Sequence, residues 1–296
     1  MTARGRYATP AAFRRALTDR ITAVSASTQW TAPQLQRQVA YDRLLERLYV
    51  VDDGWIVKGA TALLARELGM RGSLDVDLYR AEGREVAERD LRQAAALDLE
   101  DWFQFEVDAG APVAGNAVRL PIRATIGGTV WAAFHVDLVG PEIVMTGQPE
   151  DVPPIARGVI PEVEQSGYRA YPLVDHVADK VAAMYELHGE ARWPSTRFRD
   201  LVDLVAIVTG ARVGAVQQGS AITSEFERRS LSLPSSFGVP DRLLWEPGYA
   251  AEVGRSLLNV ARTLDEAVAL VGAFINPILD GSARGSWEPK PQRWVF

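Results

Sequence analysis

Residues 56–79 read IVKGATALLARELGMRGSLDVDLY and predict a short strand, a glycine turn, a helix and a second strand. Gly59 follows the first apolar run and marks the turn. Residues 73–79 alternate polar and apolar side chains, which is the pattern of a strand with one face on the core. Because side chains two positions apart on a strand share a face, Asp75 and Asp77 are predicted to project together.

The rest of the chain changes character near residue 170. Before that point the patterns predict both helices and strands, over residues 9–24, 31–50, 83–97, 102–107, 117–126 and 129–139. After a proline-rich stretch the sequence predicts helices alone, over 173–188, 196–209, 220–230 and 250–280, and then a tail, 281–296, without regular structure. We therefore predict an α+β fold, with a domain of N-terminal helices and a mixed sheet at residues 1–170 and a helical C-terminal domain at residues 171–296.

The composition narrows the possible functions. The 296 residues include no cysteine, which excludes disulfides, thiolate zinc sites and a cysteine nucleophile. No apolar stretch approaches the roughly 18 residues of a membrane span, and the polar N-terminus lacks a signal core. We therefore expect a cytoplasmic protein without a membrane partner. The net charge of −6 disfavours binding along a nucleic-acid duplex but allows a local basic surface for one nucleic-acid end.

Three aspartates form a candidate metal site. Two carboxylates on one strand face attract a hard cation such as Mg²⁺. A solvated strand face explains Asp75 and Asp77 equally simply. With 19 aspartates, the chain should contain about one Asp-x-Asp by chance. Asp137 interrupts the apolar run FHVDLV, and its burial is costly unless it binds a metal or forms an ion pair. Its neighbour His135 is predicted to point to the opposite strand face, in a structural role.

The turn at residues 58–61 is a candidate phosphate site. Backbone N–H groups at a strand-to-helix junction favour a phosphate, and glycine permits a close approach. Lys58 is one of only three lysines in the chain, and a compact positive charge suits a triphosphate. Simpler roles stay open, because Thr61 can serve as a helix cap, Gly59 as a turn residue and Lys58 as a strand end.

The order of these motifs resembles the AbiEii/AbiGii nucleotidyltransferase toxins, within the DNA polymerase β-like nucleotidyltransferase superfamily. Arg71 and Ser73 precede the two aspartates as the Arg-x-Ser-x-Asp-x-Asp part of the first family motif requires. In the predicted helical domain, Lys180 and Asp200 match the lysine and aspartate of the second signature. The likeness spans about residues 50–205.

The resemblance implies a reaction and a set of residue roles. Such enzymes transfer a nucleoside monophosphate from an NTP to a hydroxyl and release pyrophosphate, with Mg²⁺ as the cofactor, two ions being expected and Mn²⁺ an alternative. The implied metal ligands are Asp75, Asp77 and Asp137. The implied nucleotide-binding residues are Lys58, Gly59, Thr61, Arg71, Ser73 and Lys180. The implied catalytic set is Asp75, Asp77, Asp137, Lys180 and Asp200, with Asp200 orienting Lys180.

The resemblance also implies partners. These toxins belong to type IV toxin–antitoxin or abortive-infection modules with a cognate antitoxin encoded nearby, and some members add nucleotides to the tRNA 3′ end, which blocks translation. Two alternatives stay open: an acceptor hydroxyl on a protein or small molecule, and a non-catalytic toxin–antitoxin partner with the same fold. Ala60, where the family often has a second glycine, favours the latter. A glycosyltransferase would also use Asp-x-Asp, but would leave Lys180 and Asp200 unexplained.

Overall fold

The structure, a computed structural model, describes residues 3–69, 71–113, 117–161, 163 and 165–296. The chain forms two compact units. The first unit comprises Met1–Arg66, Gly72–Ile143 and Pro149–Ala170. The second unit comprises Glu67–Arg71, Val144–Gln148 and Tyr171–Phe296, so two short segments from the first half of the chain pack with the C-terminal helices.

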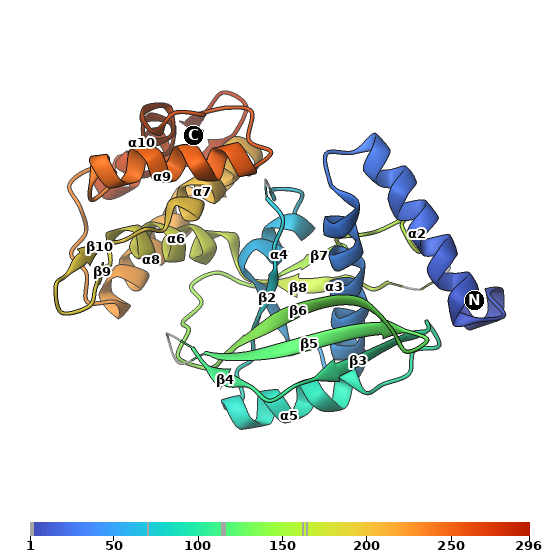
Figure 1. The fold of residues 1–296 in the computed structure, drawn as a ribbon. Coiled ribbons are helices and arrows are strands. Elements are labelled where there is room, and N and C mark those ends of the chain that lie inside the picture. Colours follow the sequence, from blue (N-terminus) through green and yellow to red (C-terminus); the bar gives the residue numbers. More distant parts are fainter. Residues whose placement is uncertain (1–2, 70, 114–116, 162, 164) are drawn as a thin grey trace. The chain divides into compact units, whose positions relative to one another are not determined.

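An eight-stranded mixed sheet forms the centre of the first unit (Figure 1). Its strands are β1 (Ile56–Lys58), β2 (Asp75–Tyr79), β3 (Phe103–Val107), β4 (Ala111–Pro112), β5 (Val118–Ile126), β6 (Thr129–Val139), β7 (Glu150–Val152) and β8 (Tyr168–Ala170). The order is β3-β5-β6-β2-β1-β8-β7, with β4 paired to β5. Strand β2 runs parallel to β6 and antiparallel to β1, which confirms the predicted mixed sheet.

The helices of the first unit are α1 (Ala3–Arg6), α2 (Pro10–Ser27), α3 (Ala32–Val51), α4 (Gly59–Ala65) and α5 (Arg84–Ala95). Helix α2 begins where the sequence predicts it, because the Thr9 hydroxyl caps the Ala12 N–H and Pro10 occupies the first helical position. Helices α3 and α5 pack against the sheet and against each other. The apolar stripe of α3 is buried in this core, including Val39, Leu44 and Leu48.

Helix α3 also carries buried charges that the sequence analysis did not interpret. Arg43 Nε lies 2.6 Å from Asp101 Oδ2, and Arg47 Nη2 lies 2.7 Å from Asp101 Oδ1. All three side chains are almost completely buried. Burial favours the neutral acid, but the two arginines outweigh it and hold the pKa of Asp101 below its usual value. This pair of ion pairs joins α3 to the segment that leads into β3.

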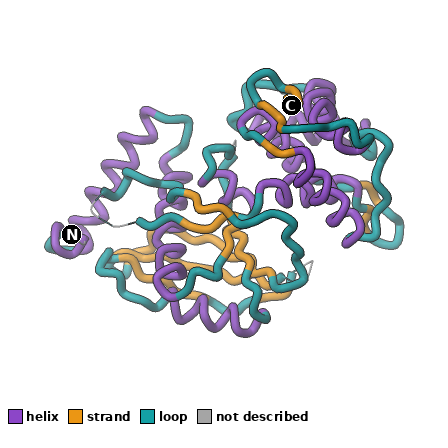
Figure 2. Tube along the Cα trace, turned by 180° about the vertical axis from the view of Figure 1, so that it is seen from behind, coloured by secondary structure: helices purple, strands orange, loops and turns teal. Residues whose placement is uncertain are grey.

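The second unit consists mainly of helices: α6 (Leu173–Tyr185), α7 (Phe198–Gly210), α8 (Ala215–Arg228), α9 (Arg242–Arg255) and α10 (Leu264–Leu279). It also contains short strands, namely β9 (Leu187–His188), β10 (Trp193–Pro194), β11 (Val213–Gly214), β12 (Ser286–Glu288) and β13 (Arg293–Val295) (Figure 2). In the part of the chain that the structure describes, no helix has the length and apolar character needed to cross a membrane.

Two expectations for this unit were wrong. The predicted helix over 250–280 is two helices, α9 and α10, separated by a loop. The tail is not irregular, because β11, β12 and β13 form a three-stranded sheet. The physical reason is burial: Trp287 on β12 is completely buried, and its indole N–H donates to the Val208 carbonyl at 2.8 Å. Its ring lies 5.2 Å from that of Phe274, which anchors the tail to α10.

Candidate active site

The sheet register brings the three predicted aspartates to one face. Strands β2 and β6 pair in parallel, with Asp75 opposite His135 and Asp77 opposite Asp137. Paired residues and residues two positions apart share a face, so all four side chains project from the same side of the sheet. The intervening apolar residues of both strands are buried on the other side. The first unit therefore carries an acidic sheet face, which we define as Asp75, Asp77 and Asp137.

His135 does not point to the opposite face, and that expectation was wrong. It lies two residues before Asp137 on one strand, so strand alternation places both on the same side. Its Nδ1 lies 3.1 Å from Asp75 Oδ1. The imidazole is therefore a direct neighbour of the acidic sheet face.

Arg119, which the sequence analysis did not select, is a cation that contacts the acidic sheet face. It lies on β5 directly opposite Asp137. Its Nε and Nη2 lie 2.8 and 2.7 Å from the two carboxylate oxygens of Asp137, and Nη2 lies 3.5 Å from Asp75 Oδ2. The hydrogen bonds to Asp137, with the charges of the three aspartates, raise the pKa of Arg119 above its ordinary value.

The acidic sheet face has the donors that a hard divalent cation needs, but its side chains do not converge on one point. Carboxylate oxygens are the ligands that Mg²⁺ and Mn²⁺ prefer. Within the described ranges, no three Asp, Glu or His side chains are grouped closely enough to hold an ion. The contacts of Arg119 account for two of the three carboxylates. Three carboxylates on one face are suitable ligands for a divalent cation. In this structure, however, two of them are hydrogen-bonded to Arg119.

Gly59 allows the third carboxylate to lie against the turn. A Cβ on this residue would meet Asp77 Oδ2 at 1.7 Å, and Gly59 has a φ of +60°, a region that favours glycine. The preceding Lys58 is almost completely buried and lies opposite Asp77 in the pairing of β1 with β2. The structure thus brings Lys58, Gly59 and Asp77 together.

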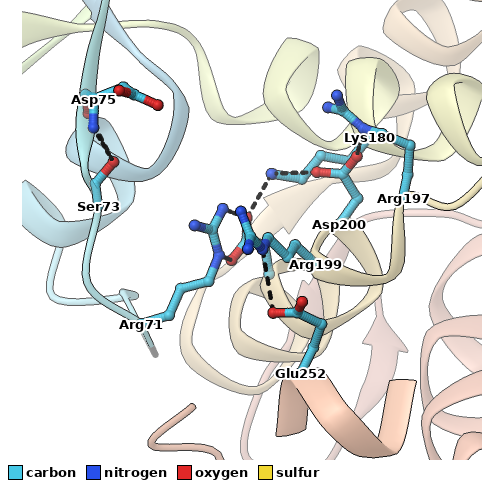
Figure 3. A network of polar contacts seen from close by, with 9 residues as sticks. Arg71, Ser73, Asp75, Lys180, Arg197, Arg199, Asp200 and Glu252 are labelled. Carbon is cyan, nitrogen blue, oxygen red and sulfur yellow. Dashed lines mark hydrogen bonds and ion pairs between the residues drawn. The ribbon is translucent and has the colours of Figure 1, made fainter. Parts of the chain in front are cut away.

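Ser73 and Thr61, the two predicted nucleotide-binding residues with hydroxyl groups, form hydrogen bonds to the backbone at the start of β2. The Ser73 Oγ donates to the Asp75 carbonyl at 2.7 Å, and its oxygen also lies 3.4 Å from the Asp75 N–H (Figure 3). The Thr61 Oγ1 is buried and donates to the same carbonyl at 3.3 Å. Both side chains therefore fix the start of β2 and so the position of Asp75.

The second unit contains the remaining predicted residues in one buried network. Lys180 on α6 donates to Asp200 Oδ1 at 2.9 Å and to Asp203 Oδ2 at 2.7 Å (Figure 3). Arg71 donates two hydrogen bonds to Asp203, at 3.1 and 2.9 Å, and Arg197 Nε lies 2.5 Å from Asp200 Oδ2. The structure therefore brings Arg71, Lys180 and Asp200 together with Asp203, which the sequence analysis did not select as a site residue.

The charges of this network outweigh the effect of burial. Burial alone would lower the pKa of Lys180, but Asp200 and Asp203 hold it above its usual value. Burial alone would raise the pKa of Asp200, but Lys180 and Arg197 hold it below its usual value. Both side chains are therefore charged at neutral pH.

A shallow cavity of about 310 Å³ lies beside the acidic sheet face in the first unit. Apolar side chains of β5 and β6 line most of it, among them Pro121 and Phe134. His135, Arg37 and the exposed Leu74 line it as well. Since His135 also contacts Asp75, the cavity and the acidic sheet face share a residue.

A known protein family matches most of the chain. The family described as the nucleotidyl transferase AbiEii toxins of type IV toxin–antitoxin systems matches residues 43–269. The chain belongs to this family. This confirms the predicted family and nucleotidyltransferase activity, and it implies an NTP substrate, a divalent metal in general terms and an antitoxin partner.

One solved structure of a nucleotidyltransferase toxin shares the fold. MenT4, a nucleotidyltransferase toxin from Mycobacterium tuberculosis, is 16% identical with a TM-score of 0.58, and the match covers 88% of each chain. JHP933 from Helicobacter pylori is 15% identical with a TM-score of 0.49, over 83% of this chain and 93% of that one. No curated protein sequence matches the chain.

Proposed function

We propose that this toxin transfers a nucleoside monophosphate from an NTP to the 3′-terminal hydroxyl of tRNA, in a Mg²⁺-dependent reaction that blocks translation. The observation that carries the proposal is the acidic sheet face. Asp77 and Asp137 lie opposite each other on neighbouring strands, and Asp75 lies two residues before Asp77 on the same face. The resemblance of the two β2 aspartates to the first motif of the family supports the proposal.

The acidic sheet face would hold the divalent cation. When bound, Mg²⁺ supplies charge neutralisation of the triphosphate and makes the acceptor hydroxyl more acidic; two ions are expected, and Mn²⁺ is an alternative. Asp75 and Asp77 would hold both ions, and Asp137 would hold the ion that activates the acceptor hydroxyl and take up the hydroxyl proton. The protein contributes mainly position and charge, as in other phosphoryl-transfer sites.

Each unit contains residues that the family resemblance assigns to the triphosphate. Lys58, Gly59, Thr61 and Ser73 belong to the first unit, where they surround Asp77 and the start of β2. Arg71 and Lys180 belong to the second unit and carry the positive charge that a polyphosphate needs. The family motif supports their assignment, and Asp200 acts as the positioning residue for Lys180.

The cavity beside the acidic sheet face supports a nucleic-acid acceptor. An apolar floor favours stacking of an unpaired base, and Arg37 provides charge for a backbone phosphate. A 3′ end needs only a small basic surface, so the net charge of −6 is compatible with it. Because His135 contacts both Asp75 and the cavity, an acceptor there would lie next to the proposed metal ligands.

The test is labelling with purified protein, total tRNA, Mg²⁺ and each α-labelled NTP in turn. We expect one or two NTPs to label tRNA, and the label to vanish when the tRNA 3′ end is oxidised with periodate. Asp75→Asn and Asp137→Asn should abolish labelling, whereas the matched control Asp151→Asn, on the exposed part of β7 in the same sheet, should retain it.

Three outcomes contradict the proposal in different ways. Label that appears on a protein would identify protein nucleotidylation. Label on oxidised tRNA would exclude the 3′-terminal hydroxyl as the acceptor. Loss of NTP binding as well as of labelling in the wild-type protein would identify a non-catalytic member of the family.

A further inference from the structure

Arg119 contacts two of the three carboxylates that are the implied ligands of a divalent cation. We propose that Arg119 is a built-in counter-cation of the metal site: its guanidinium occupies the carboxylates of the metal-free protein and must leave them before a divalent cation enters. Arg119 therefore raises the metal concentration at which the site loads. This inference rests on the proposed function, because it concerns the same aspartates.

The geometry makes Arg119 a direct competitor. Both oxygens of Asp137 accept hydrogen bonds from the guanidinium, and the shared Nη2 also lies 3.5 Å from Asp75. A carboxylate whose two oxygens face an arginine fork presents them poorly to a metal ion. One guanidinium thus holds two of the three implied metal ligands at once.

The acidic sheet face needs such a cation when no metal is present. Asp75, Asp77 and Asp137 lie on adjacent strands of one sheet, and like charges on neighbouring strand positions repel each other. The guanidinium reduces this repulsion without a metal. A divalent cation carries twice its charge and can replace it.

Arg119 can leave the site without disturbing the core. Its side chain is 40% exposed, and its strand neighbours Val118 and Leu120 keep the β5 backbone anchored in the core. The register of β5 with β6 is set by backbone hydrogen bonds and survives a change in the side-chain conformation. Exposed ion pairs of this kind are weak, so exchange for a metal is feasible.

The strand also supplies a matched control. Arg123 lies four residues further along β5, on the same face, with a side chain that is 48% exposed. It pairs with Glu106 on β3 at 2.7 Å rather than with an aspartate of the acidic sheet face. Arg123→Gln therefore removes the same charge from the same strand without freeing a metal ligand.

The experiment measures Mn²⁺ binding to the full chain, by the electron paramagnetic resonance signal of free Mn²⁺ and by calorimetry. We expect Arg119→Gln to bind Mn²⁺ roughly fivefold more tightly than the wild type, the order of magnitude of one exposed ion pair. Arg123→Gln should stay within about twofold of the wild type, and Arg119→Lys should lie between, because it keeps the charge but loses the fork.

Thermal unfolding gives a second measurement that needs no activity. Without metal, Arg119→Gln should unfold at a lower temperature than Arg123→Gln, because its carboxylates lack their cation. Saturating Mn²⁺ should raise the unfolding temperature of Arg119→Gln by more than it raises that of the wild type.

The proposal is overturned if Arg119→Gln binds Mn²⁺ no more tightly than Arg123→Gln. In that case, Mn²⁺ binding and tRNA labelling by the wild-type protein would leave the proposed function intact. If neither the wild type nor Arg119→Gln binds Mn²⁺, both proposals fail. If Arg119→Gln binds Mn²⁺ and the wild type does not, the counter-cation role is supported, because Arg119 then keeps the metal out of the wild-type site.

Discussion

Replacement of Lys180 by methionine tests how much the Lys180 charge stabilises the second unit. The measurement is one of stability, so it is independent of the proposed contact of Lys180 with a triphosphate. Lys180 has a side chain that is 7% exposed and donates to two buried carboxylates at 2.9 and 2.7 Å. Methionine keeps most of the stem and removes the ammonium group. Asp200 and Asp203 are then left as two buried carboxylates without their shared cation.

The expected cost is large. Removal of one partner from a buried ion pair costs about 3–5 kcal/mol. Arg71 still pairs with Asp203 and Arg197 with Asp200, so we expect the lower end, about 3 kcal/mol. With an m value of about 3 kcal/mol/M, the urea midpoint should fall by roughly 1 M. Urea unfolding followed by far-ultraviolet circular dichroism measures this change.

The pH dependence distinguishes a charge effect from a packing effect. In the wild type, Lys180 and Arg197 hold the pKa of Asp200 below its usual value, so its contribution is present at neutral pH and disappears only in strong acid. Without Lys180, burial dominates and raises the pKa of Asp200. The folded variant then takes up a proton as the pH falls, and its deficit relative to the wild type should shrink between pH 8 and pH 5.

A double variant completes the test. Lys180→Met with Asp200→Asn removes one of the two buried carboxylates that have lost the ammonium group. Arg197, with a side chain that is 58% exposed, can then be solvated. At pH 8 the double variant should therefore be more stable than Lys180→Met alone. A deficit that is equal at pH 8 and pH 5, together with no recovery in the double variant, would refute the electrostatic reasoning and indicate lost packing.

Two further predictions concern the first unit. Gly59→Ala should abolish nucleotidyl transfer in the labelling assay, because its Cβ would meet Asp77 Oδ2 at 1.7 Å. Gly128 also has a positive φ, +75°, but has open space around it. Gly128→Ala therefore controls for backbone strain and should retain activity. Burial raises the pKa of Asp42 to about 6 from 3.8, so the folded state binds the proton more tightly and the free energy of unfolding should fall by about 2 kcal/mol as the pH rises from 4 to 6. Urea unfolding across this range should show a flatter slope for Asp42→Asn, and equal slopes would contradict the assignment.

Local patterns made much of the first unit predictable. The Thr9–Pro10 pair fixed the start of α2, and alternation of polar and apolar residues located β2, β5 and β6 to within two residues. Alternation alone also placed Asp75 and Asp77 on one face. The same rule, applied to Asp137, would have put His135 on that face too.

Long-range partners were not predictable from local patterns. Arg71 pairs with Asp203, which lies 132 positions away, and no local pattern around Arg71 points to that partner. Trp287 looks like a residue of an irregular tail until Phe274 and the Val208 carbonyl cover it. In both cases the deciding contact joins segments whose proximity depends on the packing of the whole unit.

The position of Arg119 depends on a single extra residue in β6. The hairpin turn at Gly127 and Gly128 pairs Ile126 with Thr129 and Thr125 with Val130, and this register, continued, would set Arg119 opposite Val136 on the buried face. The register shifts after Thr125, so that Ala124 pairs with Ala132 and Arg119 with Asp137. Trp131, the residue that this shift leaves unpaired, is buried, and its indole N–H donates to the Gln36 carbonyl at 3.0 Å. The alternation of polar residues in the two strands requires such a β-bulge, because the tight turn alone would place a charged side chain in the core. The β-bulge therefore keeps the charged side chain of Arg119 out of the core and places it next to the carboxylates of the acidic sheet face.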